Sequence, residues 1–85
     1  MQNLKIFSVY DKKQEAYLNP FYRSQVGEAI REFLDAVNDD KTQFNKHPED
    51  YSLQIIGEFN NGTGIITPKT NPQIIEEAIN LKKQI

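Results

Sequence analysis

The pattern of apolar and polar residues in the first part of the chain predicts two strands. Residues 3–10 are rich in β-branched and aromatic side chains, with apolar residues on both sides of the strand. This pattern is expected when one face of a strand meets a helix and the other meets a loop or a partner. Residues 15–22 predict a second strand that returns from a polar turn, and its ladder ends at Pro20 because proline has no N–H to donate.

Residues 25–38 carry the strongest helical pattern in the chain. Their apolar residues recur at helical spacing on one stripe, and mainly charged residues occupy the other face. Ser24 is the expected N-cap, and Asn38 with two following aspartates marks the expected end. Residues 38–51 show no periodicity and predict a loop, in which residues 48–50 form one helical turn.

The second half of the chain repeats the order of hairpin and helix. Residues 52–59 and 65–67 predict two strands joined by a turn that contains Asn-Asn-Gly. A C-terminal helix is expected to follow, with Asn71 as its cap and Pro72 as its first residue. The predicted order is β-β-α-β-β-α, a single α+β domain over residues 1–85 with an antiparallel sheet and two helices packed on one face.

Composition narrows the classes of function. A chain of 85 residues without cysteine has no disulfide, no thiolate zinc site and no cysteine nucleophile, which fits a reducing compartment. The sequence shows neither a signal-peptide pattern nor an apolar run of about 18 residues, so we expect a soluble, non-exported cytoplasmic protein. Because so short a chain builds only a small core, self-association into a homo-oligomer is one way to supplement its stability.

Charge is distributed unevenly along the chain, whose net charge is −2. Residues 1–23 hold four cations against two acids, whereas residues 24–50 hold three cations against seven acids. The basic end is also aromatic, and single-stranded nucleic acid is held by cations that follow the phosphates and by rings that stack on the bases. The predicted nucleic-acid-binding residues are Lys5, Tyr10, Lys12, Lys13, Tyr17, Tyr22 and Arg23. The plainer interpretation is that these rings belong to the core or the sheet surface and that four such cations are ordinary.

Catalysis and metal binding are not expected. Three serines, one histidine and no cysteine give little material for a nucleophile held by a base and a third orienting group. His47 is followed by Pro48, Glu49 and Asp50, but one imidazole and two adjacent carboxylates do not show the spacing of transition-metal sites. This stretch therefore predicts a structural connection between loop and strand, with no metal and no cofactor.

An acidic stretch supports a different class of function. Carboxylates gather at the end of the first helix and in the loop after it, and the EF-hand spacing of a calcium site is absent there. A protein partner with basic residues would complement them. The residues predicted for such a partner are Asp35, Asp39, Asp40, Glu49 and Asp50.

Several segments of the chain agree in order and spacing with one known family. The most specific are Val9-Tyr10-Asp11, Gly27-Glu28-Ala29-Ile30-Arg31, and His47-Pro48-Glu49-Asp50-Tyr51 followed by Ile56-Gly57. Together they resemble the small nonstructural protein of gokushovirus-type microviruses, which are single-stranded DNA phages. The resemblance covers nearly the whole chain.

The resemblance implies a protein that is absent from the mature virion and acts in the cytoplasm of the infected bacterium, in genome replication or packaging. It implies single-stranded DNA as the partner and no enzymatic step, and it supplies no catalytic residues. Two other hypotheses stay open. One is an interaction module that binds the replication initiator or the capsid precursor through the acidic residues, and the other is a homo-oligomeric, scaffold-like factor.

Overall fold

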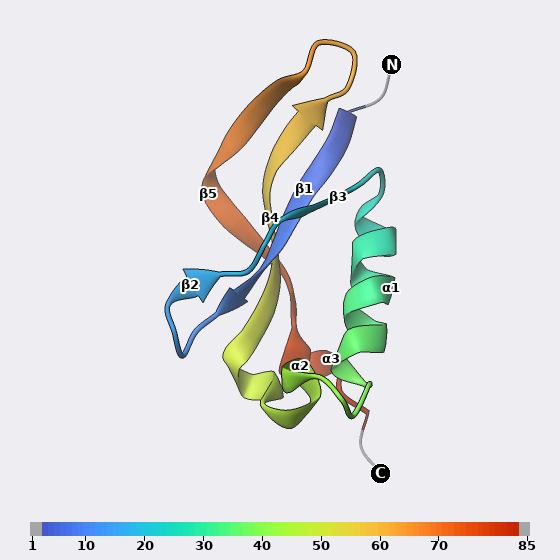
Figure 1. The fold of residues 1–85 in the computed structure, drawn as a ribbon, viewed down its shortest axis with the longest axis vertical. Coiled ribbons are helices and arrows are strands. Elements are labelled where there is room, and N and C mark those ends of the chain that lie inside the picture. Colours follow the sequence, from blue (N-terminus) through green and yellow to red (C-terminus); the bar gives the residue numbers. More distant parts are fainter. Residues whose placement is uncertain (1–2, 84–85) are drawn as a thin grey trace.

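The computed structural model describes residues 3–83 and contains a curled antiparallel sheet with a long helix along one side (Figure 1). The strands are β1 (Asn3–Asp11), β2 (Ala16–Tyr17), β3 (Phe21–Arg23), β4 (Tyr51–Asn60) and β5 (Ile65–Glu77). The helices are α1 (Val26–Val37), α2 (Gln43–Lys46) and α3 (Ala78–Leu81), with a 3-10 turn η1 (Pro48–Asp50). The α+β class is confirmed, but the element order is β-β-β-α-α-β-β-α in place of the predicted β-β-α-β-β-α.

β1 lies between β4 and the short strands β2 and β3, which pair with different parts of it. The predicted second strand over residues 15–22 is therefore wrong as a continuous element. The Leu18 N–H still donates to the Val9 carbonyl of β1 at 2.9 Å, but residues 18–20 are not in a strand, and the register against β1 changes by one residue between β2 and β3. Pro20 lies in this break and has no N–H to donate to a ladder. The chain consequently leaves β1 after β2 and returns to it further along as β3.

The core forms where α1 packs on one face of the sheet, here called the helix face. Phe7, Val9 and Leu53 supply its strand side and are all buried. Ala29, Phe33 and Val37 of α1 and Ala78 of α3 supply its helical side, so the predicted apolar stripe of residues 25–38 faces the core. Gln25 is the N-cap where Ser24 was expected; the Glu28 carboxylate accepts hydrogen bonds from the Gln25 N–H and the Ser24 hydroxyl.

The predicted C-terminal helix is wrong over most of its length. β5 continues to Glu77, and the helix that follows covers only Ala78–Leu81. Local signals at Asn71 and Pro72 favoured a helix, but the residues that follow, 73–77, pair with β4, and their β-branched isoleucines suit a strand. β5 is an edge strand with two register shifts, which is where prolines are tolerated in a sheet.

The predicted loop over residues 38–51 contains two short helical segments, α2 and η1. The Thr42 hydroxyl accepts from the Asn45 N–H at 3.2 Å, and the Asn45 side chain donates to the Val37 carbonyl at 2.9 Å. The expected turn at residues 48–50 is confirmed as η1. α2, η1 and α3 gather at one end of the molecule beside the last turn of α1 (Figure 1). None of the helices within residues 3–83 combines the length and the apolar character that a membrane crossing needs.

Candidate nucleic-acid interface

The sheet face opposite α1 collects aromatic rings from four strands. Side chains alternate across a strand, so Ile6 and Tyr10 of β1 project away from the helix face that holds Phe7 and Val9. Tyr17 lies opposite Tyr10, and Tyr22 lies opposite Ile6. Phe59 of β4 lies opposite Leu4 and so belongs to the same side. We call this surface the ring face and define it by Tyr10, Tyr17, Tyr22 and Phe59.

The rings of this face form two pairs. Tyr10 and Tyr17 have ring centroids 4.7 Å apart, and Tyr22 meets Phe59 edge to face at 5.8 Å. Tyr17 is 44% exposed and Tyr22 is 39% exposed, so each pair presents an accessible ring. Tyr17 lies opposite Tyr10 and Tyr22 lies opposite Ile6, and these two β1 residues are four positions apart. The two exposed tyrosines are therefore about 13 Å apart along the strand.

Buried polar side chains support the ring of Tyr17 from below. Its hydroxyl donates to the side-chain oxygen Oε1 of Gln54 at 2.8 Å, and the side-chain amide Nε2 of Gln54 donates to the Ser52 hydroxyl at 3.1 Å. Nearby, the buried Ser8 hydroxyl donates to the Leu18 carbonyl at 2.6 Å and fixes the chain after β2. Since these bonds satisfy polar groups that water cannot reach, they hold the Tyr17 ring in one orientation.

Two of the four predicted cations lie on the other side of the sheet. Lys5 and Arg23 are paired across β1 and β3 and project toward α1. The Arg23 guanidinium makes two bonds to the Glu32 carboxylate, at 2.5 and 2.6 Å, and lies 5.2 Å from the centre of the Phe21 ring. This hydrogen-bonded pair raises the pKa of Arg23 and lowers the pKa of Glu32. The structure thus separates these cations from the tyrosines with which they were grouped.

The other two predicted cations lie at the turn between β1 and β2. Lys12 directly follows the end of β1, and its ammonium group donates to the Glu77 carboxylate at 2.6 Å. Lys13 lines a shallow pocket together with Asp50 and His47. Its backbone N–H donates a hydrogen bond to the Asp11 carboxylate at 3.0 Å. Glu77 pairs with Ser52, which lies opposite Tyr10, so the ion pair with Glu77 holds the Lys12 side chain at the end of the ring face.

The predicted acidic partner residues are spread over three elements. Asp35 is exposed on α1, Asp39 and Asp40 follow that helix, and Glu49 and Asp50 belong to η1. The Asp39 carboxylate accepts the Lys41 N–H at 3.0 Å. The 3-10 turn η1 packs against α2 and α3, whereas Asp35 lies on α1.

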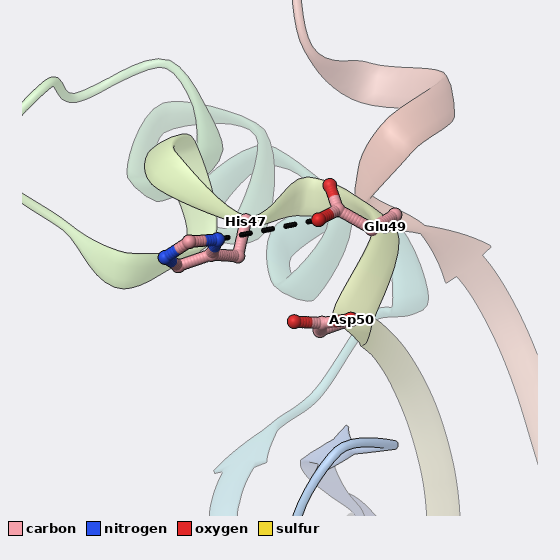
Figure 2. A group of neighbouring side chains, drawn as sticks. All are labelled: His47, Glu49 and Asp50. Atoms are coloured by element: carbon pink, nitrogen blue, oxygen red, sulfur yellow. Dashed lines mark ion pairs between the residues drawn. The ribbon is translucent and has the colours of Figure 1, made fainter.

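The stretch around His47 brings possible metal ligands together although their spacing in the sequence did not predict it. One atom each of His47, Glu49 and Asp50 lies within 4.8 Å of the others, and His47 Nδ1 is 4.0 Å from a Glu49 oxygen (Figure 2). The 3-10 turn produces this closeness. His47 and Glu49 are more than half exposed, and within residues 3–83 none of the three side chains has a buried hydrogen-bond partner of the kind that orients metal ligands.

Tyr51 lies behind this stretch and belongs to the core. Its ring meets the Phe44 ring edge to face at 4.8 Å. Burial raises the pKa of the Tyr51 hydroxyl, and the carboxylates of Asp11 and Asp50 raise it further. Tyr51 is therefore the only tyrosine of the chain that contributes to the helix face, since Tyr10, Tyr17 and Tyr22 lie on the ring face.

Phe59 is the ring that the sequence prediction missed. It lies 36 residues beyond Arg23, outside the basic, aromatic N-terminal segment from which the site was predicted. The signal that could have revealed it is the register of an antiparallel pair between residues 3–10 and 52–59, which places Phe59 beside the first strand. Composition alone carries no information on that register.

Comparison with known proteins gives a family for this chain. The family model described as Phage ORF5 protein matches residues 4–81, which is nearly the whole chain. Searches of the curated proteins and of the solved structures with this chain gave no match.

Proposed function

The chain belongs to the Phage ORF5 protein family, and for this phage protein we propose a non-enzymatic role in which the ring face binds single-stranded DNA. The observation that carries the proposal is the presence of two accessible tyrosines, Tyr17 and Tyr22, on one sheet face. Each has a second ring beside it. Curled sheets with exposed rings suit unpaired bases, because every base has a flat face on which to stack.

Stacking supplies most of the binding energy in this proposal. A base stacked on an aromatic side chain contributes about 1–3 kcal/mol, so two accessible rings contribute about 2–6 kcal/mol. The two ring pairs lie about 13 Å apart along β1, which a short run of nucleotides can bridge. Tyr10 and Phe59 back the exposed rings and limit their motion.

Phosphate contacts contribute little, because the ring face has few cations. Lys12 lies at its edge, and its ammonium group is shared with Glu77. For single strands the slope of log K against log salt is about −0.7 per phosphate neutralised, so one or two contacts give a slope of about −0.7 to −1.4. The net charge of −2 also opposes strong nonspecific binding. We therefore expect weak binding with a shallow salt dependence.

Binding of a labelled oligothymidylate, measured by fluorescence anisotropy across a salt series, tests the proposal. Because the chain has no tryptophan, quenching of its intrinsic tyrosine emission reports base stacking in the same samples. Tyr17→Ala and Tyr22→Ala should each weaken binding by about 5- to 150-fold, which corresponds to about 1–3 kcal/mol. Lys12→Ala should reduce the slope by about 0.7.

Two control variants separate the ring face from the rest of the surface. Ile79→Ala removes an exposed apolar side chain from α3, and Lys5→Ala removes a cation from the helix face. Neither variant should change the affinity for the oligothymidylate. No binding at low salt, or equal losses in the ring variants and these controls, would remove single-stranded DNA as the ligand.

The place of this activity in the phage follows from the resemblance to gokushovirus-type microviruses. A small protein that coats unpaired DNA would favour single-stranded genomes over further duplex synthesis, in genome replication or packaging. It would act in the cytoplasm of the infected bacterium and be absent from the mature virion. Virion fractions probed with an antibody against this chain, compared with lysates of infected cells, test that location.

A further inference from the structure

A recessed surface lies on the helix side of the sheet and is separate from the ring face. It is a cleft of about 240 Å³ between α1, α2 and the segment that joins β2 to β3. Its floor is apolar and is formed mainly by Val9, Phe21, Phe33, Ala36 and Phe44. Leu18 stands at its edge and is 42% exposed. A cleft of this kind accepts one or two apolar side chains.

Acidic residues run along α1 beside this cleft. Glu28, Glu32 and Asp35 follow one another at intervals of four and three residues, which places them in one row along α1. Asp39 comes directly after the helix C-cap Asn38 and adds a fourth carboxylate at the C-terminal end of this row. Glu32 itself lines the cleft. Its charge is balanced by Arg23, whereas within residues 3–83 no cation lies within ion-pair distance of Asp35 or Asp39. The segment from residue 24 to residue 50 keeps three cations against seven acids.

We propose that this cleft binds a basic protein segment, in which an apolar side chain enters the cleft and neighbouring lysines or arginines face the acidic row. Charge complementarity selects this partner. A second copy of the chain would bring its own net charge of −2 to the same acidic surface, which opposes self-association here. A nucleic acid is repelled by the same row. The site is independent of the ring face, so it stands whether or not the protein binds DNA.

Selection of random 12-residue peptides displayed on phage, with the full-length chain as bait, tests the proposal. The recovered peptides should carry a phenylalanine, leucine, methionine or tryptophan within two positions of a lysine or arginine. One such peptide is then synthesised and labelled, and its affinity is measured for the wild-type chain and for two variants. Ala36→Trp fills the cleft, and Asp35→Lys with Asp39→Lys reverses the two charges at the C-terminal end of the row but leaves the cleft open.

Each variant should weaken binding at least about tenfold, and the charge reversal should lose its effect at high salt. Tyr22→Ala on the ring face is the matched control and should bind the peptide as the wild type does. Circular dichroism checks that each variant is folded. Should Ala36→Trp fail to fold, amide shifts of Phe33, Ala36 and Phe44 on adding peptide to the wild-type chain replace it.

Several results would overturn the proposal. Recovery of peptides without basic residues, or undiminished binding by the two variants, would show that the cleft does not recognise a basic segment. Amide shifts confined to the ring face would place the peptide elsewhere. A wild-type dimer in light scattering that Ala36→Trp converts to a monomer would identify a second copy as the occupant.

Discussion

Replacing Gly57 by alanine tests the close approach of β4 and β5. A Cβ built at Gly57 would lie 2.8 Å from the Thr67 carbonyl oxygen and 3.4 Å from the Pro68 Cα. Both are backbone atoms, so no side-chain rotation relieves the contact, and the hairpin must shift. Overpacking of this kind costs about 1–3 kcal/mol. At about 0.05–0.15 kcal/mol per residue, the whole chain has a free energy of unfolding of about 4–13 kcal/mol, so the loss is a large fraction.

Urea unfolding followed by circular dichroism measures this loss, and heating should show a melting temperature lower by about 4–8 °C per kcal/mol. Gly27→Ala is the matched control. Apart from its chain neighbours and the backbone of its own helix, no atom lies within 4 Å of a Cβ at Gly27, which is in the first turn of α1, so alanine there should stabilise by about 0.5 kcal/mol. Gly57→Ala should thus lower the free energy of unfolding, and Gly27→Ala should raise it. A Gly57→Ala chain as stable as the wild type would refute the pairing of Gly57 with Pro68.

Three further predictions concern the core and its buried polar groups. Leu53→Ala should lower the free energy of unfolding by about 2–5 kcal/mol, measured in urea, because Leu53 is fully buried. Tyr17→Phe should cost about 0.5–1.5 kcal/mol through the lost bond to Gln54, while binding of oligothymidylate stays intact. The pKa of Tyr51 is higher in the folded chain than in the unfolded chain. Its contribution to the free energy of unfolding is therefore fully present below about pH 10, the ordinary pKa of tyrosine, and is lost as pH rises through the raised pKa. Tyr51→Phe should remove that part of the alkaline loss of stability, and identical pH profiles would contradict the assignment.

The parts of the fold that sequence predicts well are those whose local pattern agrees with the tertiary structure. α1 is the clearest case, because its apolar stripe needs only one surface to pack on and the helix face of the sheet supplies it. Residues 71–77 are the opposite case. Their helix signals are local, whereas the strand they form depends on a ladder with β4, so tertiary pairing overrides the propensity.

The candidate site divides in the same way. Tyr17 and Tyr22 are five residues apart, so one continuous alternating strand over residues 15–22 would put them on opposite faces. The break between β2 and β3 changes the register against β1 by one residue and brings both rings to the side of Tyr10, and the local pattern of the sequence does not show this break. Within β3, strand alternation then puts Tyr22 on the ring face. The separation of Arg23 from these rings follows from the same alternation, but its ion pair with Glu32 requires knowing where α1 lies. Phe59 required the register of β1 and β4, which a single sequence does not specify.

Contacts between base protons and tyrosine ring protons, measured by NMR on the chain bound to oligothymidylate, test the central claim most directly. Binding by the ring face predicts contacts from the thymine methyl groups to the rings of Tyr17 and Tyr22, and none to Tyr51 in the core. Contacts confined to the α1 side of the sheet, or saturation with oligonucleotide without any contact to these two rings, would contradict it.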